Sequence, residues 1–455
     1  MRIAIIGAGY VGLVSGACLA DRGHQVICVD KKPEIVATIN NGQSPLYEPG
    51  LEEILSRTVA AGRLKASTSL SQAVQWAQLS IIAVGTPMGL DGIDLRYVQD
   101  AAREIGRSLR EKEDYHLICV KSTVVPGTTD TLVRRILEAE LGMAAGEFGL
   151  AMNPEFLREG NAVEDFLYPD RIVIGAYDER SMQVMREVYA DFGAPIVKVS
   201  LRTAEMGKYT ANALLASLVS FANEIAGICE AIRDIDVKDV METVTLDKRF
   251  NPRVQGQLVN PGMISYLQAG CGFGGSCFHK DVKALIAYSR EKGREAQVLS
   301  AVMAVNAHQP LHLVMRLEEA MTGIQDKKIA VLGLAFKPGT DDVRDTPALP
   351  IISQLLQRGA RVVAVDPVAV DRMQAVLPPD PDRLEYTRDP TAALKEAQGA
   401  VIVTPWPEFT GIRPQEYAQL MSSAWILDCR RVLNKAELEK AGCKYLGAGL
   451  RVEGG

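Results

Sequence analysis

The sequence predicts an α/β protein with two doubly wound, Rossmann-like domains joined by a central helical region. Three segments near the N-terminus have counterparts near the C-terminus: residues 3–7 with 329–333, 26–30 with 362–366, and 81–87 with 401–405. Short continuous apolar runs of this kind are typical of parallel strands that are buried on both faces. Helix-type stretches lie between them, such as residues 12–21 and 348–356, which predicts strands alternating with helices in both domains.

Composition limits the classes of protein to consider. At 455 residues the chain is too long for one core and predicts two or three domains. Hydrophobic residues make up 47% and charged residues 23%, as in ordinary soluble proteins, and the formal charge of −6 argues against nucleic acid or an anionic membrane as the main partner. Eight cysteines without a CxxC pair favour reduced thiols and a cytoplasmic location. We expect no signal peptide, because only six residues precede the first glycine turn. We also expect no apolar run of membrane-spanning length and no metal site.

The first predicted loop carries a dinucleotide fingerprint. Residues 7–12 read GAGYVG, directly after a predicted strand and at the start of a predicted helix, and Asp30 follows Gly12 by 18 residues. Gly7 would form the tight turn, Gly9 would let the backbone approach a pyrophosphate, and Gly12 would allow close helix–sheet packing. The helix N-terminus offers N–H groups to phosphates, and Asp30 would accept hydrogen bonds from the ribose hydroxyls. NAD is therefore favoured over NADP, although Lys31 and Lys32 weaken that preference.

Two further strand ends are expected at the same site, because ligands bind at the carboxyl ends of parallel strands. The segments 85–87 and 121–127 both follow apolar runs and offer small polar groups. Thr123 is the better candidate for the nicotinamide half, although either segment alone reads equally as a plain loop.

Charged residues mark the next part of the site. Glu155 follows the apolar run 148–152 and is expected at a strand end that faces the cofactor, where a carboxylate can act as a base. Glu159 comes four residues later, and two solvated loop acids are the alternative. Lys208 and Asn212 share one face of a predicted helix and could hydrogen-bond an oxygen whose charge changes during a reaction.

The central region predicts two long helices. Residues 204–234 show apolar residues at helical spacing without proline, and a second stretch covers 294–321 with an interruption near Pro310. Their apolar faces must pack against the flanking domains or against a second copy of the chain. We predict a dimerisation element, with packing inside a monomer as the alternative.

The C-terminal repeat lacks the glycine fingerprint. Its first loop, residues 333–344, carries Lys337 and Arg344, and Arg430 and Arg431 follow a later strand. These cations predict an anion site for the phosphates of a nucleotide-bearing substrate, with an ordinary surface loop as the alternative.

The segment 270–281, GCGFGGSCFHKD, is the most informative of the chain. It places Cys277 at the end of a glycine-rich turn, with Lys280 and Asp281 three and four residues later. A thiol is nucleophilic as thiolate, which positive charge and helix-start N–H groups favour. A buried structural cysteine is the alternative, and we expect Cys271 to be a turn residue with no chemical part.

Taken in order, the motifs GAGYVG, VGTP, KSTVVPGT, NPEFLREG, AEMGKYTANALLA, GFGGSCFHKD and GLAFKPGTDDVRDTP resemble those of the UDP-glucose/GDP-mannose dehydrogenase family over nearly the whole chain. The resemblance implies an NAD-dependent oxidation of a nucleotide sugar from primary alcohol to acid. Cys277 would add to the aldehyde as a thiohemiacetal and then carry a thioester. Lys208 and Asp281, with Asn212 beside them, would hold or activate the water and the reacting oxygens. Glu155, helped by Thr123, would be the base for thioester hydrolysis.

The resemblance also implies binding roles. Arg344 matches a position that contacts the cofactor, which replaces its expected role at the anion site. The cofactor-binding positions are Gly7, Gly9, Tyr10, Val11, Gly12, Asp30, Gly85, Thr86, Pro87, Ser122, Thr123, Glu159 and Arg344. The substrate-binding positions are Glu155, Phe156, Leu157, Glu159, Lys208, Asn212, Arg249, Tyr266, Gly272, Phe273, Phe336, Lys337 and Arg430.

The implied domains are residues 1–200 for NAD, 201–322 for the helical dimerisation region with Cys277, and 323–455 for the UDP-sugar. UDP-glucose is the expected substrate, GDP-mannose is the nearest alternative, and a non-catalytic nucleotide-binding or redox-sensing protein is the alternative from another class.

Two departures from the family pattern stand out. Residues 251–262 look like an inserted irregular loop, which leaves open whether Arg249 or Arg253 contacts the sugar. His279 stands where proline is common and is expected to face solvent.

Overall fold

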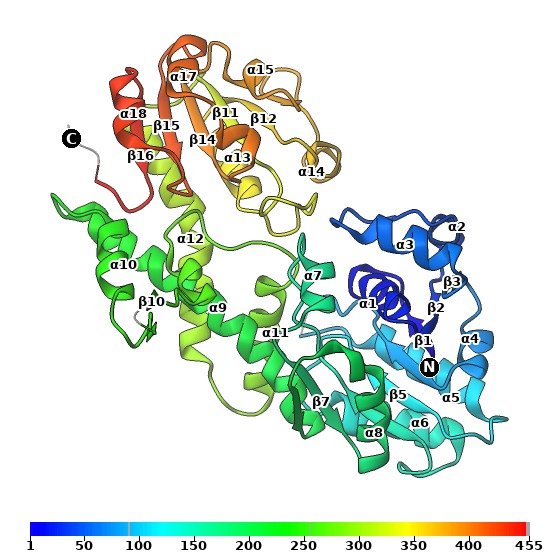
Figure 1. Cartoon of the computed structure of the whole chain (residues 1–455). Coiled ribbons are helices and arrows are strands. Elements are labelled where there is room, and N and C mark those ends of the chain that lie inside the picture. The colour runs from blue at the N-terminus through cyan, green and yellow to red at the C-terminus, as the bar shows by residue number, and fades with distance from the viewer. Residues whose placement is uncertain (90–91, 256, 452–455) are drawn as a thin grey trace. The chain divides into compact units, whose positions relative to one another are not determined.

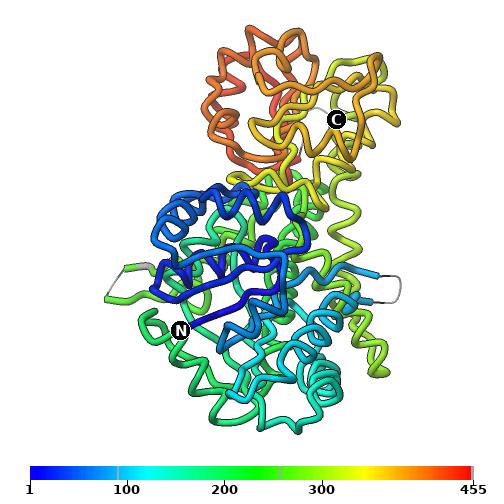
Figure 2. The backbone as a smooth tube through the Cα atoms, turned by 90° about the vertical axis from the view of Figure 1, so that its right-hand side faces the viewer, coloured from blue at the N-terminus to red at the C-terminus, as the bar shows by residue number. Residues whose placement is uncertain are grey.

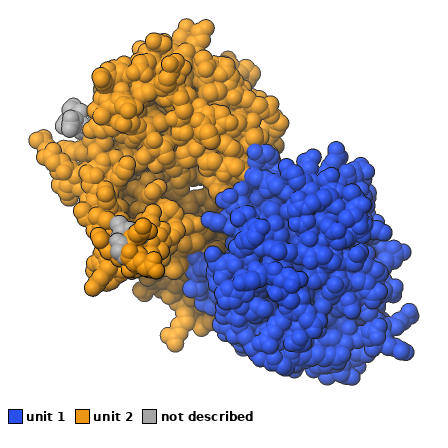
Figure 3. All heavy atoms as spheres, viewed as in Figure 1, with its two compact units in different colours: residues 1–211 blue, residues 212–455 orange. Residues whose placement is uncertain are grey.

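Two β-sheets organise the chain, one near each end (Figure 1). The computed structural model describes residues 1–89, 92–255 and 257–451. The chain divides into two units, Met1–Ala211 and Asn212–Gly455, which Figure 3 colours blue and orange. Each unit is considered by itself below.

The first sheet has eight strands in the order β3-β2-β1-β4-β5-β6-β7-β8, and every neighbouring pair is parallel except β6 and β7. Its strands are β1 (Arg2–Ile6), β2 (Gln25–Val29), β3 (Leu64–Ser67), β4 (Leu79–Ile82), β5 (Leu117–Val120), β6 (Gly149–Met152), β7 (Ile172–Ala176) and β8 (Ile196–Val199). The helices of this unit are α1 (Tyr10–Asp21), α2 (Pro33–Asn40), α3 (Leu51–Ala60), α4 (Leu70–Trp76), α5 (Arg96–Leu109), α6 (Arg134–Leu141), α7 (Ala162–Leu167) and α8 (Glu179–Val188).

Successive side chains of β1 enter two different cores, as expected for a strand buried on both faces. Ile3 and Ile5 belong to an apolar cluster with α1 and α3, whereas Ala4 and Ile6 belong to another with α4 and α5. Helices therefore cover both faces of the sheet, and the carboxyl ends of its parallel strands are left for loops.

The second sheet repeats the plan with six parallel strands in the order β13-β12-β11-β14-β15-β16. Figure 2 traces the backbone as a tube from the N-terminus in blue to the C-terminal part of the chain in orange and red. The strands are β11 (Lys328–Leu332), β12 (Arg361–Val365), β13 (Leu384–Thr387), β14 (Gly399–Ile402), β15 (Trp425–Asp428) and β16 (Lys444–Gly447). The helices are α13 (Ala348–Gln357), α14 (Val370–Val376), α15 (Pro390–Leu394), α16 (Pro407–Thr410), α17 (Pro414–Leu420) and α18 (Lys435–Lys440). The central strand β11 lies between β12 and β14, as β1 lies between β2 and β4, so the predicted repeat and the doubly wound fold are confirmed.

Helices dominate the segment between the sheets: α9 (Leu201–Ala231), α10 (Val237–Thr245), α11 (Phe278–Glu291) and α12 (Gln297–Ala320). The predicted interruption near Pro310 is wrong, because α12 runs through Pro310 without a break. Pro310 is buried there, and packing compensates for the one backbone hydrogen bond that proline cannot make.

The inserted segment 251–262 is more regular than expected. It forms a short antiparallel hairpin of β9 (Arg253–Val254) and β10 (Gln257–Leu258), and the Asn251 side chain accepts a hydrogen bond from the Asn260 N–H at 2.8 Å. Gly256, between the two strands, lies outside the described residues.

By length and composition alone, α9 and α12 are each long and apolar enough to cross a membrane, so the expectation that no apolar run approaches that length is wrong. Core helices of soluble proteins satisfy the same criterion. Both helices also carry buried polar side chains, among them Lys208 and Asn306, that bond within the fold.

Candidate active site

The loop after β1 has the backbone that a dinucleotide turn requires. Gly7 has φ +101°, and a Cβ on it would lie 2.9 Å from the Ala83 carbonyl oxygen. A Cβ on Gly12 would lie 1.9 Å from the Gly7 carbonyl oxygen, so this position must lack a side chain. Gly9 is exposed and a Cβ there would meet nothing within 4 Å, which leaves bare backbone at the start of α1. This cradle fits a pyrophosphate.

Asp30 closes the same loop at the end of β2. Its carboxylate accepts hydrogen bonds from the Ala8 N–H at 3.2 Å and from the Lys32 N–H at 3.0 Å. The side chain is thus fixed beside the glycine turn and still partly exposed, as a ribose-binding carboxylate must be.

Tyr10, the first residue of α1, is tied to an acid that sequence reasoning did not identify. Its hydroxyl donates to Glu48, which is buried and also accepts from the N–H groups of Gly160 and Ala162 at 2.7 and 2.6 Å. Burial and this hydrogen bond raise the pKa of Tyr10. Glu48 therefore anchors the loop that carries Glu155 and Glu159, a role that no sequence spacing indicates.

The two predicted strand-end loops are bonded to each other. The Thr86 hydroxyl donates to the Thr123 carbonyl at 2.8 Å, and the Ser122 hydroxyl donates to the Val84 carbonyl at 2.7 Å. Gly85 and Pro87 are exposed beside them, and Val11 on α1 is partly exposed. These residues follow β4 and β5, which pair with each other next to β1 in the parallel part of the sheet, so the loops lie along one edge of it.

A second unpredicted acid fixes the end of the 121–127 loop. Glu205 on α9 is fully buried and accepts from the N–H groups of Gly127 and Thr129 at 2.6 and 2.7 Å. Burial raises the pKa of Glu205 to about 7, because desolvation outweighs the two hydrogen bonds.

Glu155 and Lys208 form a buried ion pair. The Lys208 Nζ lies 2.9 Å from Glu155 Oε1, and their side chains are only 3% and 6% exposed. The other carboxylate oxygen accepts from the Leu157 N–H at 2.6 Å, and Lys208 lies over the Phe156 ring. Burial raises the pKa of Glu155, but the Lys208 cation and these hydrogen bonds outweigh it and hold the pKa below its usual value. The structure thus brings together a carboxylate and a cation that lie 53 residues apart in sequence.

Cys277 stands out among the eight cysteines, all of which lie within the described residues. Seven are buried, whereas Cys277 is partly exposed. It precedes the first residue of α11, where the helix dipole favours negative charge, and its sulfur lies 3.5 Å from the Ser276 hydroxyl.

Asp281 lies one turn into α11 and is 1% exposed. The Asn212 amide donates to Asp281 Oδ2 at 2.6 Å, and the Lys280 ammonium lies 2.5 Å from Oδ1. Asn212 thus contacts the first turn of the helix that follows Cys277, within one unit. Cys271, by contrast, is fully buried, with its thiol directed to the Val403 carbonyl at 3.8 Å.

The glycine-rich turn packs directly on the loop after β11. Gly275 has φ +84°, and a Cβ there would lie 2.7 Å from the Phe336 ring. Its N–H donates to the Arg344 carbonyl at 3.0 Å, and a Cβ on Gly274 would lie 2.5 Å from the Asp345 carbonyl oxygen. These glycines are thus required for the turn to reach the second sheet.

Side-chain amides hold the start of the same turn. Asn306 on α12 accepts from the Phe273 N–H at 2.8 Å and also contacts the His279 ring nitrogen Nε2 at 2.9 Å. Gln309 donates to the Gly270 carbonyl at 2.7 Å. The expectation that His279 faces solvent is wrong, because its ring also lies 5.0 Å from that of Phe273 and its side chain is 17% exposed.

The predicted cations of the second sheet are partly anchored. Arg430 donates to the Val403 carbonyl at 2.8 Å and reaches the Gly272 carbonyl at 3.4 Å, so it lies beside the glycine-rich turn. Lys337 lies 5.6 Å from the Phe336 ring centre. Arg344 is exposed and forms a forked pair with Asp342.

The second sheet has no free counterpart of Asp30. Asp366 ends β12 at the equivalent place but is fully buried, and its carboxylate accepts from the N–H groups of Leu334 and Ala335 and from the Trp406 indole at 3.0 Å. This acid serves the fold and, unlike Asp30, leaves no exposed carboxylate at the end of its strand.

Other predicted positions are less engaged. Arg249 pairs with Asp247 and is 79% exposed, and Arg253 is exposed on β9, so neither is held at a site in this unit. Tyr266 contacts the Phe278 ring next to Cys277, at 6.2 Å between ring centres. Glu159 is partly exposed after the Glu155 loop.

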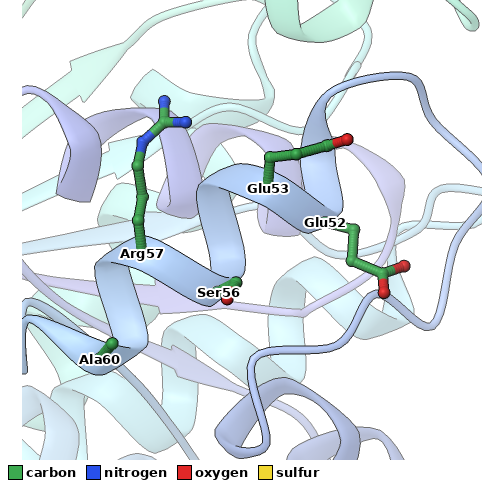
Figure 4. Close-up of a pocket in the computed structure, with 5 residues that line it drawn as sticks. All are labelled: Glu52, Glu53, Ser56, Arg57 and Ala60. Atoms are coloured by element: carbon green, nitrogen blue, oxygen red, sulfur yellow. The ribbon is translucent and has the colours of Figure 1, made fainter.

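A depression on the outer surface of α3 involves none of these residues. It is lined by Glu52, Glu53, Ser56, Arg57 and Ala60, and the Arg57 side chain points away from the helix (Figure 4). Arg57 is paired with Asp21 at 2.7 Å, which leaves an ordinary charged helix surface.

One spacing in the sequence bears on metal binding: His308 and His312 stand four residues apart on α12. Their rings stack at 6.0 Å, and His312 pairs with Glu230. Among residues 1–89, 92–255 and 257–451, no three or more His, Cys, Asp or Glu side chains gather in a group able to hold a metal ion.

Comparison with known proteins places these features in one family. Models of the UDP-glucose/GDP-mannose dehydrogenase family match the chain in three parts: the NAD binding domain over residues 1–193, the central domain over 202–308 and the UDP binding domain over 330–435.

Individual relatives match over most of their length. The UDP-glucose 6-dehydrogenase AglM of Haloferax volcanii is 40% identical over 96% of this chain and 98% of its own. A GDP-mannose 6-dehydrogenase of Azotobacter vinelandii is 41% identical over 80% of this chain and 81% of its own. The solved structure of a UDP-glucose dehydrogenase from Pyrobaculum islandicum is 41% identical, with a TM-score of 0.88 over 98% of this chain and 97% of that one.

Proposed function

Because this chain belongs to the UDP-glucose/GDP-mannose dehydrogenase family, we propose that it oxidises UDP-glucose to UDP-glucuronate, with two molecules of NAD reduced per sugar. It is an NAD-dependent oxidoreductase. We favour UDP-glucose over GDP-mannose as the substrate because relatives named UDP-glucose 6-dehydrogenase match 96–99% of the chain at 36–41% identity. The GDP-mannose 6-dehydrogenase of Azotobacter vinelandii matches 80% of the chain, and a solved GDP-mannose dehydrogenase that covers 98% of it is 32% identical.

NAD is the cofactor, and each bound molecule accepts one hydride. The residues of the first unit fit it: bare backbone at Gly9 for the pyrophosphate, and the fixed carboxylate of Asp30 for the ribose. In our proposal the loops at 85–87 and 122–123 line the nicotinamide half, and Arg344 and Glu159 contact the cofactor as the family motifs imply.

In the first oxidation, C6 of the sugar loses a hydride and its hydroxyl loses a proton, which gives the aldehyde. We assign Lys208, Asn212 and Asp281 to the reacting oxygen and its proton. The Cys277 thiolate then adds to C6, a C–S bond forms, and the carbonyl electrons move to oxygen as the thiohemiacetal. Loss of the second hydride from this tetrahedral carbon gives a thioester on Cys277.

Hydrolysis completes the reaction. Glu155, with Thr123 nearby, removes a proton from water, which attacks the thioester carbonyl. The C–S bond breaks, Cys277 leaves as thiolate, and the sugar carries a carboxylate. The sum is one alcohol, one water and two NAD converted to one carboxylate, two NADH and three protons.

We propose that residues 1–200 bind NAD and that residues 323–455 bind the nucleotide end of the substrate. The helical region 201–322 carries Cys277 and the side chains around it. We propose that Phe336, Lys337 and Arg430 bind the UDP-sugar, with Gly272, Phe273 and Tyr266 near the sugar. The hydrogen bond from the Arg430 side chain to the Gly272 carbonyl supports this grouping. Of the two candidate arginines, we favour Arg249, which keeps the place of the family arginine before the inserted hairpin.

We further propose a homodimer in the cytoplasm. An apolar stripe on α9 repeats every seven residues, at Leu214, Phe221 and Ile228, and each of these side chains is more than half exposed. Exposed apolar stripes of this kind mark contact surfaces. A second copy of α9 would cover this stripe. None of the eight cysteines, all of which the structure describes, forms a disulfide, which suits a reducing compartment.

The observation that carries the proposal is the placement of Cys277: it is the one partly exposed cysteine, at the start of a helix whose first turn holds Asp281 bonded to Asn212. The test is NADH production by the purified protein with UDP-glucose, GDP-mannose and UDP-N-acetyl sugars. We expect turnover of UDP-glucose with a kcat/KM at least about tenfold above the others, a difference of about 1.4 kcal/mol.

Cys277→Ser should form no acid, while the matched control Cys443→Ser, at a buried cysteine far along the chain, should retain activity. Faster turnover of GDP-mannose would replace the substrate, and no turnover of any nucleotide sugar would contradict the enzyme assignment.

A further inference from the structure

Lys121, at the end of β5, is a buried cation with no role in the mechanism above. It is 3% exposed, and its ammonium group donates to Asn153 Oδ1 at 2.9 Å. The same oxygen accepts from the Tyr189 hydroxyl at 2.6 Å, and the Asn153 amide donates to the Val173 carbonyl at 2.8 Å. Asn153 is thus fixed with its oxygen toward Lys121.

The charged groups around Lys121 come from three elements. Cys119 lies on its own strand, Glu155 follows β6, and Lys208 comes from α9; each acts electrostatically on Lys121. The Phe166 ring of α7 lies 5.5 Å from the ammonium group, and Tyr189 approaches through Asn153. Burial raises the pKa values of Cys119 and Tyr189, so both are neutral, and Glu155 is the anion whose charge acts on Lys121.

The charges of two lysines, Lys121 and Lys208, thus act on the single carboxylate of Glu155. An isolated carboxylate buried as deeply as Glu155 would take up a proton. Lys208 alone would neutralise it, but Lys208 is also assigned to the reacting oxygen of the sugar. A second cation lets Lys208 bond that oxygen while Glu155 stays ionised. It also leaves the group with a net charge of +1, which suits the oxyanion of the thiohemiacetal.

We propose that Lys121 is a positioning residue of the reaction: its ammonium group holds Glu155 as a carboxylate and supplies the second positive charge beside the Glu155–Lys208 pair. This inference rests on the proposed function, in which Glu155 is the base for thioester hydrolysis.

The buried site also sets a pH window. Burial lowers the pKa of Lys121 to about 8. The net charge therefore falls from +1 to zero as the pH rises through about 8, and Glu155 limits the reaction on the acid side. The rate should show an acid limb from Glu155 and an alkaline limb from Lys121.

The experiment compares full-length Lys121→Gln, Lys121→Met and Lys121→Arg with the wild type. Gln is neutral and can still donate to Asn153, whereas Arg keeps the charge at every accessible pH. Lys112→Met is the control. Lys112 is a partly buried lysine whose ammonium group donates to the Val74 and Gln75 carbonyls and contacts the His116 ring. We measure kcat against pH with UDP-glucose and NAD, and KM for both.

At pH 7 the neutral variants should lose about tenfold or more in kcat with little change in KM, and their acid limb should move up by about one pH unit. Lys121→Arg should recover most of kcat and lose the alkaline limb. The proposal would be overturned if a neutral variant kept the acid and alkaline limbs of the wild-type pH profile, or if kcat of Lys121→Arg were as low as that of the neutral variants.

A second measurement does not depend on turnover. The carboxyl ¹³C shift of Glu155, assigned by comparison with Glu155→Gln, reports its pKa directly in the wild type and in Lys121→Gln. A higher pKa in the variant supports the inference even where the protein oxidises another sugar, and an unchanged pKa contradicts it. Absence of UDP-glucose oxidation by the wild type, with the shift present, would refute only the proposed function.

Discussion

At the scale of single residues, the account depends on Glu155 being both buried and ionised. Its pKa lies below the usual value because Lys208 and the Leu157 N–H outweigh the effect of burial. A carboxylate that is ionised at neutral pH and shielded from bulk solvent can accept a proton from a water molecule bound next to it.

Replacing Glu155 with Gln should therefore block the last step more than the earlier ones. We expect two NADH to form rapidly per active site, followed by turnover slower by on the order of 10²-fold or more. Mass spectrometry should then find the sugar acid attached to Cys277. The adduct should be absent from Glu155→Gln/Cys277→Ser, and a steady state without burst or adduct would remove Glu155 from the role of base.

Asp30 should determine the choice between NAD and NADP. Asp30→Asn can keep one backbone hydrogen bond of this side chain but loses its charge. We expect KM for NAD to rise about tenfold and the preference over NADP to shrink, because a charged hydrogen bond to the ribose is weakened and repulsion of a 2′-phosphate is removed. Equal KM values for NAD in the variant and the wild type would show that Asp30 does not contact the cofactor.

Sequence reasoning singled out Asp30 and Glu155 because each follows a strand, which limits where the side chain can lie, and Cys277 because it ends a glycine-rich turn. It missed Glu48, Glu205 and Lys121. Each of these acts on a segment far away in sequence, Glu48 on Gly160 and Glu205 on Gly127, and only the packed structure shows that the partners meet. Lys121 opens a motif that was recognised, but its burial is a property of the folded sheet.

At the scale of elements, α9 contributes a buried acid, Glu205, that affects both the shape of a site loop and the stability of the first unit. Glu205 holds the N–H groups of Gly127 and Thr129 and thereby fixes the loop that carries Thr123. Burial raises its pKa from 4.5 to about 7. The folded state thus binds a proton that the unfolded state releases between these pH values.

This difference predicts a pH dependence with a defined sign. The higher pKa of Glu205 in the folded state contributes at most about 3 kcal/mol to the free energy of unfolding. This contribution is complete below about pH 4.5 and is lost as the pH rises through about 7. Glu205→Gln cannot ionise, so its thermal midpoint relative to the wild type should increase from pH 4.5 to pH 7.5. A constant difference across this range would show that Glu205 has the same pKa in both states.

The exposed stripe on α9 leads to a prediction about assembly. A double substitution, Leu214→Lys and Phe221→Lys, should convert a dimer to a monomer because it places two charges in the proposed apolar contact. Light scattering after size exclusion measures the mass, and Val376→Lys, at an exposed valine on α14, is the control. A wild-type protein of monomer mass would contradict the dimer, and an unchanged mass of the double variant would place the contact elsewhere.

The elements that sequence predicted least well are those whose form depends on packing. Proline normally ends a helix, yet Pro310 is buried in the middle of α12. The insertion at 251–262 has little apolar content, and its hairpin rests on a few backbone pairs and on Asn251.

At the scale of the whole molecule, the internal repeat carried most of the fold prediction. Strands with the same order surround β1 and β11, and the apolar runs needed to bury both faces of a sheet are visible in sequence. The divergence of the two sheets is not visible there. Asp30 and Asp366 occupy equivalent strand ends, but only Asp30 keeps an exposed carboxylate, because Trp406 and four backbone N–H groups occupy Asp366.

The central claim is that one chain removes two hydrides from the same carbon with Cys277 holding the intermediate. The direct test is complete oxidation of UDP-glucose that carries two deuterium atoms on C6. The account predicts two equivalents of deuterated NADH for each UDP-glucuronate formed by the wild type, and no UDP-glucuronate from Cys277→Ser. One deuterated NADH per sugar with an aldehyde product, or acid formation by the serine variant, would contradict it.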